Sequence, residues 1–95
     1  GNLRRQQGDL QGSLEDYDHT ISLNDQDSIA FNSRGVVRVQ LGDMNGARVD
    51  YDRAIEINPT QPSFYQNRSN LRRQMGDLTG AQEDLDQAVS LKSSR

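Results

Sequence analysis

Residues 41–59 read LGDMNGARVDYDRAIEINP and carry the signals for one complete helix with a turn on each side. Gly42 is the residue type that most often ends a helix, because glycine adopts a left-handed backbone without strain. Asp43 is a favoured N-cap, and its carboxylate suits the positive end of the helix that follows. Apolar residues then recur at helical spacing as far as Asn58-Pro59, where the proline forces the residue before it out of the helical region.

The same signals recur along the chain with a period of 34 residues. Every glycine falls into one of three columns at this spacing, and several aspartates follow the same period. The glycine columns are Gly8, Gly42 and Gly76; Gly12, Gly46 and Gly80; and Gly1 and Gly35. A period of this length is typical of stacked repeats. We therefore expect a single domain over residues 1–95, with a partial repeat at 1–27 and full repeats at 28–61 and 62–95.

Each repeat is expected to form two antiparallel helices, since no segment shows the sustained alternation of a strand. In residues 28–61 the first helix precedes Gly42 and the second follows Asp43. In residues 1–27 the motif Gly-Asp-x-x-Gly at positions 8–12 predicts that a short first helix ends at Gly8 and that a second helix follows. The predicted fold class is all-α, an antiparallel helix-hairpin array of about two and a half repeats.

This helix–turn–helix unit resembles the tetratricopeptide repeat (TPR) over essentially the whole chain. The sequences of its repeats are most similar to those of bacterial members. Residues 28–61 carry the pattern most fully, with Phe31, Gly35, Gly42, Ala47, Tyr51, Ala54 and Pro59. Residues 62–95 depart from it at Ser69, Leu85 and Ser93. The resemblance implies a right-handed α-solenoid whose first helices line a concave groove. It also implies a non-catalytic module that binds proteins or peptides.

Small residues have a mechanical role in such an array. Ala47 facing Gly35, and Ala81 facing Ser69, would let the two helices of a hairpin approach closely. A single hairpin cannot bury its own apolar face, so stability comes from stacking on the next hairpin. We therefore expect apolar surface to be exposed at the ends of the array, including parts of Leu78, Leu85 and Val89. This leaves open an alternative function, a self-assembling scaffold in which hairpins of different chains stack end to end.

Composition argues against several classes of protein. The net charge is −3, there is no cysteine, and there is one histidine. We expect no nucleic-acid binding, because that depends on positive charge, and no membrane insertion, because no apolar run approaches about 18 residues. Neither a thiol nucleophile nor a disulfide framework is possible. The expected location is cytoplasmic, although a chain without an initial methionine is expected to be a piece of a longer one.

Catalytic and metal-binding chemistry find little support. Glu15, Asp18 and His19 share one helix face at a spacing that could hold a metal ion. The matching positions of the other repeats carry different residue types, so we expect a solvated face there. The interpretation is no enzyme, no cofactor and no metal.

Charge is segregated between the two kinds of helix. The expected first helices contain no acid and contain Arg4, Arg5, Arg34, Arg38, Arg68, Arg72 and Arg73, whereas the second helices hold most of the acids. With the geometry that the family resemblance implies, this gives a basic-to-polar groove that suits an extended, acidic peptide. A second interpretation stays open. The arginines that recur in every copy could instead pair inside the array with Asp50, Asp52, Asp84 and Asp86.

Positions that differ between copies are better ligand candidates. By the geometry of the family, the candidate groove residues are Asn2, Arg5, Gln6, Asn32, Ser33, Val36, Val39, Gln40, Gln66, Asn67, Asn70, Arg73 and Gln74. Arg5 and Arg73 would bind an anionic group, and Val36 and Val39 would form a central apolar spot. Chaperone-adaptor members of the family hold a terminal carboxylate with a set of Lys, Asn and Arg residues. The matching positions here carry Asn2, Ser33, Ser63 and Asn67, of which only Asn2 agrees, so the acidic tails of the large chaperones are not expected as ligands.

Overall fold

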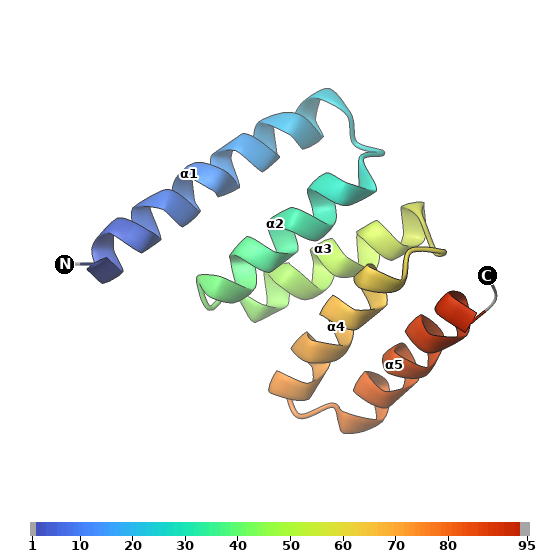
Figure 1. Cartoon of the computed structure of the whole chain (residues 1–95). Coiled ribbons are helices and arrows are strands. Elements are labelled where there is room, and N and C mark those ends of the chain that lie inside the picture. Colours follow the sequence, from blue (N-terminus) through green and yellow to red (C-terminus); the bar gives the residue numbers. More distant parts are fainter. Residues whose placement is uncertain (1, 94–95) are drawn as a thin grey trace.

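A computed structural model describes residues 2–93, with side chains described from Gly8 onward. It contains five helices, which follow one another across the molecule in chain order (Figure 1). They are α1 (Asn2–Leu23), α2 (Ser28–Gln40), α3 (Met44–Ile57), α4 (Pro62–Gln74) and α5 (Leu78–Ser93). The described residues contain no strand, and the predicted all-α hairpin array is confirmed.

The turns after α2 and α4 form as the sequence predicts. Gly42 and Gly76 have φ angles of 89° and 88°, in the left-handed region that glycine reaches without strain. After α2, the N–H of Asp43 donates to the carbonyl of Arg38 at 2.8 Å, which closes the end of the helix. The Asp43 carboxylate then accepts from the N–H of Gly46 at 3.0 Å and caps α3. One aspartate thus serves both helices of the hairpin.

The predicted turn at Gly8-Asp9 is wrong. Helix α1 runs without interruption for 22 residues, and the Gly-Asp-x-x-Gly motif at positions 8–12 lies in its interior. Residues 2–7, the described part of the chain before Gly8, make fewer than two helical turns, whereas 13 residues form α2. A helix this short is marginal on its own, and a turn yields stability only when the helix before it packs back on the helix after it. Residues 2–7 therefore continue α1 instead of forming a first helix.

The two helices approach closely in both full hairpins, although the nearest neighbours of Gly35 are Tyr51 and Asp50 and not the expected Ala47. A Cβ at Gly35 would lie 2.6 Å from the ring of Tyr51, so only glycine lets α2 lie this near to α3. In the next hairpin the matching residue is Ser69, which is fully buried and donates its hydroxyl to the carbonyl of Ala81 at 2.7 Å. The serine that departs from the family pattern thus satisfies its polar group across the same interface.

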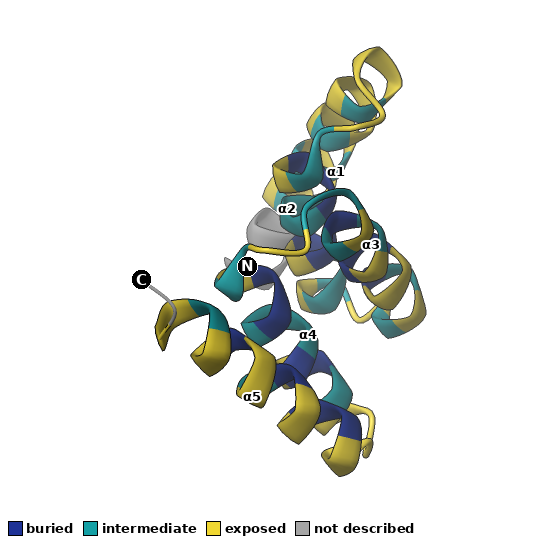
Figure 2. Ribbon diagram, turned by 90° about the vertical axis from the view of Figure 1, so that its right-hand side faces the viewer, coloured by how far each residue is buried: buried dark blue, intermediate teal, exposed yellow. Residues whose placement is uncertain are grey.

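Stacking between hairpins builds the core. Phe31, Ala54 and Phe64 form one buried cluster that takes a residue from each of α2, α3 and α4. Buried residues lie mainly between the helices, and exposed residues follow the outer side of α5 (Figure 2). There Leu78 and Val89 are 66% and 61% exposed, as expected for an end of the array. Uncovered apolar surface on α5 is therefore a feature of the described structure.

Candidate functional site

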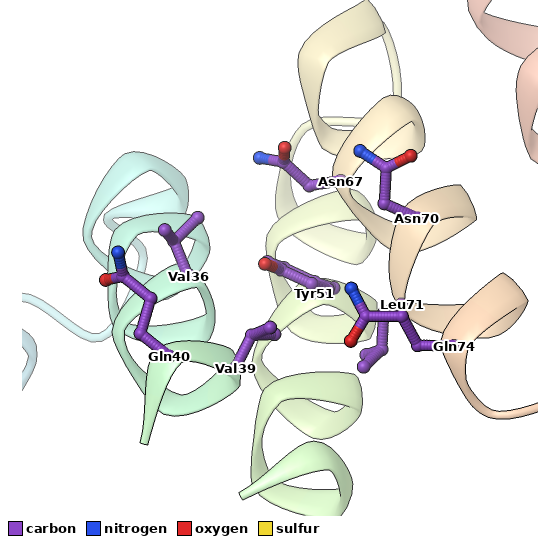
Figure 3. Close-up of a pocket in the computed structure, with 8 residues that line it drawn as sticks. All are labelled: Val36, Val39, Gln40, Tyr51, Asn67, Asn70, Leu71 and Gln74. Atoms are coloured by element: carbon purple, nitrogen blue, oxygen red, sulfur yellow. The ribbon is translucent and has the colours of Figure 1, made fainter. Parts of the chain in front are cut away.

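A pocket of about 180 Å³ opens between α2 and α4, with a residue of α3 at its base (Figure 3). Its lining combines apolar side chains with carboxamides. The lining residues are Val36, Val39 and Gln40 of α2, Tyr51 of α3, and Asn67, Asn70, Leu71 and Gln74 of α4. We call it the α2–α4 pocket. None of these described lining residues is charged.

The chemistry of the α2–α4 pocket is amphipathic. Each carboxamide offers both a donor and an acceptor, the pair of groups that a peptide main chain needs. Asn67 already donates its Nδ2 to Oδ1 of Asn32 at 3.0 Å, which links α4 to α2 beside the pocket. The base is apolar, because Tyr51 and Leu71 belong to a buried cluster against which Val39 packs. Burial, with a smaller contribution from Asp50, raises the pKa of Tyr51 to about 12.

Two arginines of α2 donate to one buried aspartate of α3 and are therefore not free to bind a ligand. Arg34 donates from Nε and Nη2 to the two carboxylate oxygens of Asp50, at 3.0 and 2.8 Å. Arg38 donates from Nη1 to the same carboxylate at 3.0 Å. Asp50 is 0% exposed. Its hydrogen bond raises the pKa of Arg34, although burial opposes that shift.

The hairpin of α4 and α5 repeats this arrangement. Arg68 donates to both oxygens of Asp84 at 3.0 and 2.8 Å, and Arg72 donates to Asp84 at 3.1 Å. Burial is the largest single influence on the pKa of Arg68 and lowers it, but the hydrogen bonds and charges of Asp84 and Asp52 together raise the pKa overall. A bidentate arginine–carboxylate pair with a second arginine is therefore a built-in element of each full hairpin.

Each bidentate arginine also reaches the hairpin before it. Arg34 donates to Asp18 of α1 at 2.9 Å, and Arg68 donates to Asp52 of α3 at 3.1 Å. Of the two interpretations of the recurring arginines, pairing inside the array is the one that the structure shows. Asp18 joins the expected partners, whereas Asp86 has no arginine partner among the described residues and accepts from Gln82 of its own helix at 2.9 Å.

The structure brings some of the predicted groove residues together. Those that line the α2–α4 pocket are Val36, Val39, Gln40, Asn67, Asn70 and Gln74. Ser33 and Gln66 are half-buried outside it, and Arg73 is exposed on α4 with no ion-pair partner among the described residues. The side chains of Asn2, Arg5 and Gln6 lie outside the described part.

Two lining residues, Tyr51 and Leu71, were missed as site residues. Leu71 follows Val37 in the repeat, and this apolar column was visible in the sequence. Leu71 lines the pocket, whereas Val37 is buried and does not line it. This difference depends on tertiary packing.

Where side chains are described, no group of three or more histidines and carboxylates could hold a metal ion. Asp18 of the candidate trio on α1 pairs with Arg34 instead. None of the helices in the described chain combines the length and apolar character that crossing a bilayer requires.

Comparison with known proteins supports the architecture. Family models described as tetratricopeptide repeat match residues 29–61 and 50–83, which together span more than half of the chain. No curated protein sequence matches the chain. The crystal structure of MamA is similar with a TM-score of 0.86 and 21% identity, over 90% of this chain. This chain spans 50% of the length of that MamA chain.

Two peptide complexes share the fold. The first TPR of Spaghetti (RPAP3), bound to the HSP90 peptide SRMEEVD, matches with a TM-score of 0.86 and 19% identity, over 100% of this chain and 75% of that one. PcrH in complex with the chaperone-binding region of PopD matches with a TM-score of 0.85 and 23% identity, over 100% of this chain and 71% of that one. Repeat period, hairpin geometry and family models agree, and the chain belongs to the tetratricopeptide-repeat family.

Proposed function

We propose that the chain is a non-catalytic interaction module that holds an extended peptide segment in the α2–α4 pocket. The observation that carries this proposal is the lining itself, an apolar base surrounded by carboxamides. Gln40, Asn70 and Gln74 can bond to the main chain of an extended segment, whatever its sequence. Val36, Val39 and Leu71 can contact one apolar side chain of that segment. Similar folds that hold peptides, such as PcrH with PopD, support the same function.

The proposed ligand also carries an acidic residue. The reason is one exposed arginine beside the pocket and not the overall charge of the groove. Arg34, Arg38, Arg68 and Arg72 are engaged by aspartates of the array, so they are not available to a ligand anion. Arg73 is exposed and directly precedes the pocket residue Gln74 in the sequence. We place the acidic residue of the ligand at Arg73, beside the apolar residue in the pocket.

A peptide array tests this proposal. The probes are heptapeptides whose central residue is Leu or Gly and whose flanking residues are Glu or Lys. We expect Leu-centred, Glu-flanked peptides to bind best, because they fill the apolar base and pair with Arg73. The Arg73→Glu variant should reverse the preference between Glu and Lys while leaving helicity and melting temperature unchanged.

Arg48→Glu provides the matched control, since Arg48 is exposed on α3 and does not line the pocket. Equal binding of the Leu- and Gly-centred peptides would reject the pocket as the site. An unchanged Glu preference in Arg73→Glu would reject the acidic component alone.

A second candidate function is a self-assembling scaffold, favoured by the exposure of Leu78 and Val89 on α5. Its test is the solution mass by light scattering over a hundredfold dilution. A larger species that dissociates on dilution, and that Leu78→Glu abolishes, supports assembly. A monomer at every concentration rejects it.

A further inference from the structure

The interface between α3 and α4 shows how the outer face of the second helix of a hairpin is covered in this molecule. Arg68 of α4 reaches back to Asp52 of α3 at 3.1 Å while it holds Asp84 of its own hairpin. Arg34 of α2 does the same with Asp18 of α1. Both arginines lie 16 residues from each of their two aspartates. Each interface between hairpins therefore carries one ion pair of fixed register.

Helix α5 carries a copy of this surface, and no described helix packs on it from the outer side. Asp86 follows Asp18 and Asp52 in the 34-residue column, but no arginine of the described residues reaches it. Among the described residues, Gln82 of the same helix donates to it. The carboxylate that receives an arginine at the two preceding interfaces is thus still exposed on α5.

The apolar residues around Asp86 follow the same pattern. On α3, Met44 and Ile55 are half-buried and pack against core clusters that contain Leu71 and Phe64 of α4. Their counterparts one repeat later are Leu78 and Val89, which are largely exposed. A neighbouring helix that covered Leu78 and Val89 would remove their apolar surface from water. Such burial is the main source of stability between stacked hairpins.

We propose that the outer face of α5, defined by Leu78, Asp86 and Val89, is a docking site for a helix with the pattern aromatic-x-x-Arg. Both internal examples have this pattern, as Phe31 with Arg34 and Tyr65 with Arg68. In each, the guanidinium lies over the ring, at 5.4 and 5.7 Å from its centroid. The ring thereby holds the arginine in place to bond with a carboxylate on the neighbouring helix.

The occupant is a helix from outside the described fold. Arg34 and Arg68 of this chain already bind aspartates on both sides, so a folded second copy cannot offer α2 or α4 to Asp86, and self-assembly through this face would have to use another helix. The arginine of the docking helix pairs with Asp86, and its apolar residues cover Leu78 and Val89. This site is distinct from the α2–α4 pocket, none of whose lining residues belongs to α5.

The probe is a fluorescein-labelled peptide with the sequence of residues 60–77, which contains α4. A lactam bridge between positions 70 and 74 keeps it helical, since short helices are marginal alone and both positions are exposed in α4. Fluorescence anisotropy with the whole chain should show saturable binding. Asp86→Arg in the protein, or Arg68→Asp in the peptide, should each weaken binding roughly tenfold, and the two together should restore most of it.

Glu83→Arg is the matched control, with the same charge change on the same helix. Its counterpart in α3 is Val49, which stays 59% exposed with α4 in place, so Glu83→Arg should leave binding unchanged. A peptide that displaced α4 would respond to Asp52→Arg and not to Asp86→Arg, and that result would overturn the proposal. So would the absence of saturable binding, or equal weakening by Glu83→Arg and Asp86→Arg. A reversed Glu/Lys preference of the pocket peptides in Arg73→Glu, with binding of the α4 peptide intact, separates the two sites.

Discussion

The motif Gly-Asp-x-x-Gly occurs three times in this chain and adopts two different structures. At positions 42–46 and 76–80 its first glycine is left-handed, and its aspartate caps the next helix at 3.0 and 2.9 Å. At positions 8–12 the same residue types lie inside the continuous helix α1. The local sequence is nearly the same, so the difference must come from what surrounds it.

The difference lies in the helix before the motif. In the full repeats that helix packs on the one that follows, and two arginines close on one buried aspartate. The counterpart of Asp50 in α1 is Asp16, which is exposed and has no ion pair among the described residues. The motif permits a turn, and the packing of the two helices decides whether the turn forms. Three predictions test this comparison.

The largest effect is expected at the buried aspartate. Asp50→Ala would leave Arg34 and Arg38 without their shared partner and should lower the free energy of unfolding by about 3–5 kcal/mol. Asp16→Ala, in the same column, should change it by less than about 0.5 kcal/mol, as an exposed substitution does. Urea denaturation followed by circular dichroism measures both.

Equal losses in these two variants would show that Asp16 is also paired and that α1 folds back as a hairpin in solution. If Asp50→Ala does not fold, Asp50→Asn keeps one oxygen acceptor and should show a smaller loss in the same direction.

Alkaline pH should remove a comparable amount of stability through Tyr51. Its pKa is raised to about 12 by burial first and by Asp50 second, from an ordinary value of 10.0. The folded state therefore holds the phenolic proton more tightly than the unfolded state. This contribution is complete below about pH 10 and is lost as pH rises towards 12, by roughly 3 kcal/mol in total. Tyr51→Phe should flatten the stability curve over that interval. An unchanged curve in that variant would assign the loss to other groups.

The smallest effect, of opposite sign in the two regions, is expected at the glycines. Gly42→Ala should cost about 1–2 kcal/mol, because an L-residue is strained at φ 89°. Gly8→Ala should gain about 0.5–1 kcal/mol, since it lies within α1 and an added Cβ would meet nothing within 4 Å. Thermal melting of both variants measures the difference. A loss at Gly8 as large as at Gly42 would indicate a turn at positions 8–12.

Much of the fold could be predicted from short signals. The period, the glycine stops, the aspartate caps and Pro59 place the boundaries of α2, α3 and α4 within about a turn. The same signals wrongly predicted a turn at Gly8. A turn residue carries no information on whether the two helices beside it pack on each other. Asp43 was predicted as a cap, yet its bond back to Arg38 at the end of α2 could only be seen in three dimensions.

The candidate site was less predictable than the fold. Variation between repeats drew attention to Asn67, Asn70, Val36 and Val39, and Gln40 and Gln74 were added because they lie beside those positions. It did not draw attention to the residues at the base of the pocket. Tyr51 stands at an aromatic position of the family pattern. That position predicts packing, but it does not distinguish a core residue from a residue of a pocket wall. Charge segregation was visible in the sequence, whereas the direction in which each arginine turns depended on the exact distance between helices.

The two kinds of arginine bond also differ in strength, and this affects how the molecule deforms. Within a hairpin, three hydrogen bonds meet on a buried carboxylate, whereas between hairpins a single bond ends on Asp18 or Asp52, which are about half exposed. Exposed pairs are weak and are screened by salt. The hairpins are therefore the stiff units, and the joints between them are the compliant ones. Because α2 and α4 lie on opposite sides of such a joint, the width of the pocket between them varies with ionic strength more readily than the shape of either wall.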